Sequence, residues 1–302
     1  AKHVPLNYWS SSWIPGINAA RPNTFTLAEA WLEGDSTQLK PYLDAGFDST
    51  FNFPLRKALV DSIGKAGSLD ILAAKVQDYT TNLGINRALL QVNFLDNHDV
   101  QRFINEPGFG VAESEIRKRY HMGLGALFTL PGIPQLYYGD ELGVYGGGDP
   151  DNRKDMPSWA WTDAGRNATQ SGYLAGGGNP KTTFDFVQKL TYIRGNNEAL
   201  WKGGYVELWR PNGGATNVFA FYRGNNLNNR FVVVFNNGSA ASGNVTINIS
   251  GNTFLPATDR SYMASATYDD QAGQGAPATI TASGGNLVVN LPAKTFAIYK
   301  AR

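Results

Sequence analysis

The chain reads Leu89-Leu-Gln-Val-Asn-Phe-Leu-Asp-Asn-His-Asp99 in its first third, where a short apolar run passes into a polar and acidic cluster. Residues 89–95 have the length and character of a buried strand, and residues 113–130 beyond them read as a helix. A second short strand is expected at residues 135–138. Strands that alternate with helices form βαβ units, so this stretch predicts a parallel sheet with polar groups at the end of one strand.

The same alternation extends from residue 1 to about residue 200. In chain order, the other elements expected there are a helix at 4–17, a strand at 24–28, a short helix at 39–45, a strand at 46–53, a helix at 69–82 and a helix at 184–200. Four strands with helical material after each make half of the about eight units in a closed (β/α)8 TIM barrel. Half a barrel leaves two sheet edges unpaired, so a missing partner is expected.

Residues 201–302 have a different pattern, in which short strands of alternating character are separated by Gly- and Asn-rich turn clusters. The strands expected there lie at 219–222, 231–235, 245–249, 287–291 and 295–299. This pattern is typical of an antiparallel β-sandwich. The fold class is therefore α/β plus all-β, with one domain at residues 1–200 and a second at residues 201–302.

Composition narrows the classes of partner. The 26 basic and 25 acidic residues give a net charge of +1, which predicts binding to neither nucleic acid nor an anionic membrane surface. Aromatic residues make up 12% of the chain and suit the faces of neutral sugar rings. Because cysteine is absent, disulfides and thiolate metal sites are excluded. Pro131 and Pro134 interrupt the longest apolar run, so no membrane span is expected.

Acidic side chains follow two of the expected strands. Glu29 comes directly after the strand at 24–28, and Asn97, His98 and Asp99 follow the strand at 89–95. In parallel barrels the reactive groups lie at the carboxyl ends of the strands. Hydrolysis of a glycosidic bond needs one protonated and one ionised carboxyl group. The alternatives are a surface carboxylate at Glu29, a core histidine at His98 and a helix cap at Asp99.

Four motifs in order resemble signatures of the α-amylase family. They are Phe25-Thr-Leu-Ala-Glu-Ala-Trp31, Phe94-Leu-Asp-Asn-His-Asp99, Gly132-Ile-Pro-Gln-Leu-Tyr-Tyr-Gly-Asp-Glu141 and Asp149-Pro-Asp-Asn-Arg153. Residues 291–299 are similar to the last strands of that family's C-terminal sandwich. The resemblance implies the second half of a (β/α)8 TIM barrel and a retaining glycoside hydrolase that cleaves internal α-1,4-glucosidic bonds in starch and related glucans.

The resemblance also implies a role for each matching residue. Glu29 matches the general acid/base, and Asp99 matches the carboxylate that stabilises the oxocarbenium-like transition state. His98 matches an imidazole that hydrogen-bonds the same sugar. Asp149 and Arg153 match a pair that binds glucose units further toward the non-reducing end, and the alternative for them is an ordinary ion pair within a loop.

The first residues resemble the end of another family motif, which reads Arg-x-Asp-x-x-Lys-His and whose Asp is the nucleophile. On this match that Asp would lie two residues before Ala1. Lys2 then matches a residue at the leaving-group sugars, and His3 matches one whose backbone oxygen binds a structural calcium ion. We therefore expect an N-terminal half, separate or missing from this sequence, to supply the nucleophile, and we expect this chain alone to be inactive.

Two other functions stay open at this point. The first is an α-glucan transglycosylase of the same family, which differs only in what attacks the intermediate. The second is a non-catalytic glucan-binding fragment, since no acid of the chain matches the nucleophile. The resemblance further implies a secreted protein.

Overall fold

The computed structural model describes residues 1–170, 174, 179–211, 216–224 and 229–302. Its N-terminal part contains four short strands, β1 (Leu27–Ala28), β2 (Ser49–Thr50), β3 (Val92–Phe94) and β4 (Ile133–Gln135). β1 pairs with β2 and β3 pairs with β4, both in parallel, and a parallel bridge between Phe51 and Val92 joins the two pairs. The expectation of four parallel strands in chain order is therefore confirmed.

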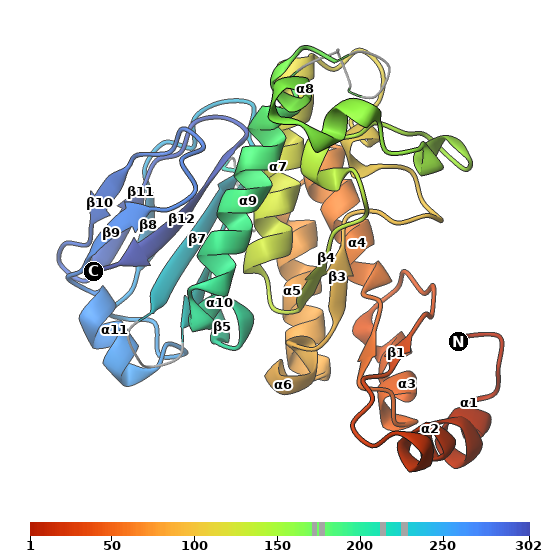
Figure 1. Ribbon diagram of the computed structural model, residues 1–302. Helices are drawn as coiled ribbons and strands as arrows, with labels where there is room; N and C mark the ends of the chain where they lie inside the picture. Colours follow the sequence, from red (N-terminus) through yellow and green to blue (C-terminus); the bar gives the residue numbers. More distant parts are fainter. Residues whose placement is uncertain (171–173, 175–178, 212–215, 225–228) are drawn as a thin grey trace.

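Helices separate these strands and cover them (Figure 1). The α-helices of this part are α1 (Leu6–Tyr8), α2 (Ile14–Ala20), α3 (Lys40–Asp44), α4 (Phe53–Leu59), α5 (Leu69–Asn82), α6 (Ile85–Ala88), α7 (Glu113–Thr129), α8 (Asp163–Asn167), α9 (Lys181–Gly195) and α10 (Glu198–Trp201). π-helical turns at Trp9–Trp13 and Val60–Gly64 continue α1 and α4. Short 3-10 turns lie at Ser36–Gln38, Phe103–Asn105, Asp140–Leu142, Asp151–Arg153 and Ser158–Trp161.

Two of the expected strands end earlier than predicted. The strand expected at 46–53 is shorter, because the Asn52 side chain accepts a hydrogen bond from the backbone N–H of Leu55 and so caps α4, which the sequence did not predict. The strand expected at 135–138 ends at Gln135. Beyond it Tyr137 donates its backbone N–H to the Asp140 carboxylate, and Asp140 donates its own to the carbonyl of Tyr137, which closes a turn.

Helix limits were predicted more closely. α5 has the expected limits, and α7 ends one residue early. The first helix runs from residue 6 to residue 20 instead of 4–17, because it begins after Pro5 and ends before Pro22. The helix expected at 184–200 is divided into α9 and α10.

The C-terminal part is built on an antiparallel sheet with strand order β10-β9-β12-β7-β6-β5. Its strands are β5 (Gly204–Trp209), β6 (Val218–Gly224), β7 (Arg230–Asn236), β9 (Thr267–Asp270), β10 (Thr279–Thr281) and β12 (Thr295–Ala301). A second antiparallel sheet pairs β8 (Val245–Asn248) with β11 (Asn286–Val289), and a helix, α11 (Ala257–Met263), precedes β9. β5, β9, β10 and α11 were not predicted.

The larger sheet has a hydrophobic core on each face. One core joins Phe221, Phe235 and Phe296 of this sheet to apolar side chains of α5, α7 and α9. The other joins Val232 and Val234 to residues of β8 and β11, which form a second layer. Figure 1 shows the helices against one side of the sheet and the small sheet against the other. Among the described residues, no helix is both long and apolar enough to cross a membrane.

Candidate active site

The two candidate carboxylates follow parallel strands. Glu29 comes directly after β1, and the segment with Asp99 comes after β3. Since the strands are parallel and joined through β2, their carboxyl ends lie at the same edge of the sheet. The Glu29 side chain is exposed, and its carboxylate has no polar partner within the described residues. Its backbone oxygen accepts a hydrogen bond from the amino terminus of Ala1.

Asp99 is held by its own loop. Its backbone N–H donates to the Asn97 side-chain oxygen at 2.9 Å, and its carboxylate lies 3.3 Å from Nε2 of His98. The His98 side chain is 55% exposed and that of Asp99 is 31% exposed. His98 is therefore not a core histidine. No helix begins at Asp99, so this residue is not a helix cap either. Both side chains are open to a ligand.

Asp149 and Arg153 form an ion pair that reaches the same loop. Nε of Arg153 lies 2.9 Å from the Asp149 carboxylate and donates to the backbone oxygen of His98 at 3.0 Å. Nη2 of Arg153 lies 3.8 Å from the Asp99 carboxylate. Exposed ion pairs contribute little to stability, commonly about 0–1 kcal/mol, so the pair is more significant as a charged surface beside Asp99. The structure thus brings four of the sequence-predicted residues together.

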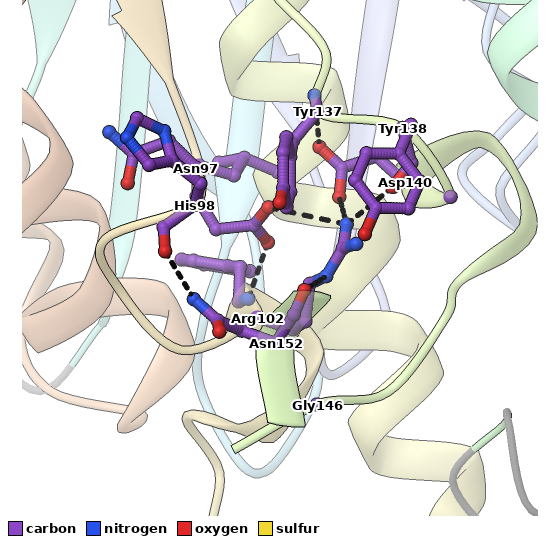
Figure 2. A network of polar contacts seen from close by, with 12 residues as sticks. Asn97, His98, Arg102, Tyr137, Tyr138, Asp140, Gly146 and Asn152 are labelled. Carbon is purple, nitrogen blue, oxygen red and sulfur yellow. Dashed lines mark hydrogen bonds and ion pairs between the residues drawn. The ribbon is translucent and has the colours of Figure 1, made fainter. Parts of the chain in front are cut away.

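Arg102 was missed by the sequence analysis. Its side chain is 1% exposed, and its Nη1 donates to the backbone oxygen of Tyr138 at 2.6 Å and to the Asp140 carboxylate at 3.3 Å. Its Nε donates to the backbone oxygen of Asn152 at 3.1 Å. The rings of Tyr137 and Tyr138 lie 4.1 and 4.9 Å from the guanidinium carbon. Figure 2 shows this arginine between the segment that follows β3 and the segment that follows β4. The feature of the sequence that could have indicated its role is its position three residues after Asp99.

Two buried carboxyl groups flank Arg102. Asp140 accepts the bond described above, and Asp96 lies 3.8 Å from the same Nη1. Burial raises the pKa of Asp140 well above its ordinary value, the Asp96 charge adds to the rise, and Arg102 opposes it. Burial also raises the pKa of Asp96, again opposed by Arg102.

Asn152, in the segment that follows β4, also contacts the segment that follows β3. It is buried, and its side-chain amide donates to the backbone oxygens of His98 and Val100, both at 2.9 Å (Figure 2). These carbonyl groups stand on either side of Asp99 in the sequence. Asn152 therefore holds the backbone around the candidate carboxylate.

Lys2 and His3 lie apart from this network. Nζ of Lys2 donates to the backbone oxygen of Trp31 at 3.2 Å, which places it near Glu29, and His3 is exposed. The His3 carbonyl oxygen is of the kind that calcium prefers. However, the described part of the chain has no group of three or more His, Asp or Glu side chains that could hold a metal ion. Calcium binding at the His3 backbone oxygen therefore stays a prediction.

A cavity of about 680 Å³ lies beside the same loops. Its lining includes Gln101, Asn105, Phe109, Tyr145 and Gly147. Neither Glu29 nor Asp99 lines it.

Comparisons with known proteins give a family match and several individual relatives. Residues 6–203 match the family model described as "Alpha amylase, catalytic domain". The cyclomaltodextrinase of Thermoanaerobacter pseudethanolicus is 31% identical over 249 residues, which cover 79% of this chain and 36% of that protein. The cyclomaltodextrin glucanotransferase of Bacillus licheniformis is 29% identical over 294 residues, which cover 95% of this chain and 34% of that protein. The chain thus spans about a third of the length of these relatives.

A solved structure gives the same result. The crystal structure of an Anoxybacillus α-amylase superposes with a TM-score of 0.78 at 25% identity, over 100% of this chain and 57% of that one. The superposition includes the C-terminal antiparallel sheet as well as the helical part. Together with the family match over most of the N-terminal part, it shows that the chain belongs to the α-amylase family of glycoside hydrolases.

Proposed function

We propose that residues 1–200 are the second half of a (β/α)8 barrel and residues 201–302 a C-terminal β-sandwich domain of an enzyme that hydrolyses internal α-1,4-glucosidic bonds with retention. The observation that carries the proposal is the position of Glu29 and Asp99 after β1 and β3, at one edge of a parallel sheet, in a chain of this family. Starch and related glucans are the proposed substrates.

In the first step of this mechanism, a nucleophilic carboxylate attacks the anomeric carbon of the sugar. The bond from that carbon to the bridging oxygen breaks, and protonated Glu29 gives its proton to that oxygen, which leaves as a hydroxyl group. Asp99 stays ionised and stabilises the positive charge that develops on the sugar, while the exposed His98 beside it hydrogen-bonds a sugar hydroxyl group. The sugar is now bound covalently to the nucleophile.

In the second step Glu29, now ionised, takes a proton from a water molecule whose oxygen attacks the same carbon. The bond to the nucleophile breaks, and the sugar leaves with its original anomeric configuration. Asp149 and Arg153 bind glucose units further along the chain, and Lys2 lies on the side of the leaving group. Their roles come from the positions that they match in the family motifs.

The nucleophile is proposed to come from an N-terminal half that forms the rest of the barrel. Lys2 and His3 match the end of the motif that carries it, and the chain covers only 34–36% of the two relatives described above. Calcium is proposed to bind the His3 backbone oxygen together with ligands from that half, and no step described here uses the ion. Secretion is proposed from the family alone.

The test is a reaction of the purified protein with maltoheptaose, followed by proton NMR, which distinguishes the α- and β-anomers as they are released. We expect α-anomers from the chain once it is combined with an N-terminal half. Initial release of β-anomers would exclude a retaining mechanism. Glucan binding without turnover in the combined protein would instead support a non-catalytic glucan-binding fragment.

Transglycosylation is the second candidate, because a cyclomaltodextrin glucanotransferase matches 95% of this chain. In that reaction a sugar hydroxyl group takes the place of water in the second step. Products formed from starch over time distinguish the two. Linear maltooligosaccharides support hydrolysis, whereas cyclic dextrins at early times support transfer.

A further inference from the structure

Two loops carry the residues that would bind substrate. The β3 loop, residues 96–103, carries His98 and Asp99, and the β4 loop, residues 136–153, carries Asp149 and Arg153. We propose that Arg102 is a positioning residue, which fixes the β3 loop against the β4 loop and so sets where Asp99 stands relative to Arg153. The consequence for glucan binding rests on the proposed function, whereas the positioning itself does not.

Arg102 reaches the β4 loop at several points along its length. Its backbone N–H donates to the oxygen of Gly146 at 3.0 Å. Its side chain donates to the backbone oxygens of Tyr138 and Asn152 and to the Asp140 carboxylate. One arginine of the β3 loop thus binds the start, the middle and the end of the β4 loop.

Asn152 connects Arg102 to the backbone around Asp99. The backbone oxygen of Asn152 is held by Arg102, and its side-chain amide holds the carbonyl groups of His98 and Val100. A shift of the Arg102 side chain would therefore move the backbone on both sides of Asp99. Figure 2 shows the dashed contacts of Arg102, Asn152 and His98.

The buried charge of Arg102 favours a geometric role. A buried ion pair contributes little net stability, because removing both charges from water costs about as much as their attraction supplies. Asp96 and Asp140 nevertheless flank the guanidinium, and Asp96 also accepts the backbone N–H of Phe103 at 2.6 Å, where the β3 loop ends. The planar fork of arginine can bind several acceptors in fixed directions, which lysine cannot.

The experiment compares Arg102→Met, Arg102→Lys and Arg223→Met. Arg223 is the matched control, because it is a fully buried arginine that donates to three backbone oxygens, those of Thr129, Gly203 and Gly204, away from both loops. The probe is the imidazole of His98, observed by NMR with labelled histidine in the protein as purified. His98→Gln assigns its signal. Far-UV circular dichroism confirms that each variant is folded.

We expect Arg102→Met to shift the His98 signal and leave that of His121 unchanged, Arg102→Lys to shift it less, and Arg223→Met to leave it in place. An unchanged His98 signal in folded Arg102→Met would overturn the proposal, as would an equal shift in Arg223→Met. If Arg102→Met does not fold, Arg102→Lys decides by the same criterion.

A binding measurement separates this inference from the proposed function. Calorimetric titration with maltoheptaose should show weaker binding by Arg102→Met and Arg102→Lys than by Arg223→Met. If the unsubstituted protein, combined with its N-terminal half, binds no glucan, the proposed function fails, and the His98 signal still tests the positioning role. A shifted His98 signal together with unchanged maltoheptaose affinity would overturn the link to substrate.

Discussion

Nη2 of Arg153 lies 3.8 Å from the Asp99 carboxylate, although the two residues belong to loops that follow different strands. The same guanidinium binds the Asp149 carboxylate at 2.9 Å. Arg153 thus connects Asp99, in the segment after β3, with Asp149 in the segment after β4. Under the proposed function, a glucan bound at Asp99 would pass Arg153.

Arg153→Ala is predicted to lower kcat/KM more for long substrates than for short ones. If Arg153 contacts a remote glucose unit, only a substrate long enough to reach it loses binding energy. We expect about a tenfold fall in kcat/KM for maltoheptaose, equivalent to about 1.4 kcal/mol, and a smaller fall for maltotriose. The control is Lys154→Ala, the neighbouring cation, which pairs with Asp151. Equal losses on both substrates would contradict the remote role.

Glu29→Gln is predicted to remove hydrolysis and retain glucan binding. The amide has nearly the same volume as the acid but cannot donate or accept the proton, so kcat should fall by about 10²–10⁴. The measurement is hydrolysis of maltoheptaose by the combined protein, with affinity measured separately by calorimetry. Glu33→Gln is the control, because Glu33 is an exposed acid nearby that accepts the indole N–H of Trp31. Undiminished turnover in Glu29→Gln would exclude it as the acid.

Much of the carboxylate arrangement could be predicted from the sequence because strand endings are local features. Glu29 and Asp99 follow short apolar runs, and the parallel order of those runs brings their ends to one edge. α5 was equally accessible, since Ser68 caps its first turn and Leu69–Asn82 keeps an unbroken helical pattern. The chemical roles of the two acids stay predictions.

The supporting network could not be predicted because it depends on tertiary contacts. Arg102 reads as an ordinary loop cation, and only the fold shows it enclosed between Asp96, Asp140 and two tyrosine rings. Strands β9 and β10 were missed for a similar reason. Their polar residues resemble loops, and it is pairing with each other and with β12 that orders them.

The free energy of unfolding is predicted to fall as the pH falls, because of His121. Nδ1 of His121 faces the side-chain oxygen of Gln274 at 3.0 Å, and Nε2 faces the Thr183 hydroxyl group at 3.2 Å. Burial lowers the pKa of His121 below the ordinary value of about 6.5, so the folded chain keeps it neutral. As the pH falls below about 6.5, unfolded chains take up a proton that folded chains do not. This residue then costs up to about 1.4 kcal/mol of unfolding free energy per pH unit.

The check is urea unfolding at several pH values between about 7.5 and 5.5, which span the ordinary histidine pKa. His121→Gln should lower this pH dependence, because glutamine cannot take up the proton. His3→Gln is the control, since His3 is exposed. An identical pH dependence in His121→Gln and the unsubstituted protein would show that other groups cause the loss.

Combination with an N-terminal half is predicted to convert this chain from an inactive, self-associating protein into an active enzyme. Within the described residues, β1 pairs only with β2, and β4 pairs only with β3, so the parallel sheet ends in two open edges. Phe25 and Trp31, beside β1, are 51% and 37% exposed, which adds apolar surface near one of these edges. Because retention also requires a nucleophile that no acid of this chain matches, the same partner should supply both the missing surface and the missing carboxylate.

The test is to prepare residues 1–302 with and without the first barrel half of a relative, and to measure starch hydrolysis and solution mass for each. A variant of the partner with its nucleophilic Asp changed to Asn should restore the mass of the assembly but not the activity. A monomeric and active preparation of residues 1–302 alone would contradict the prediction.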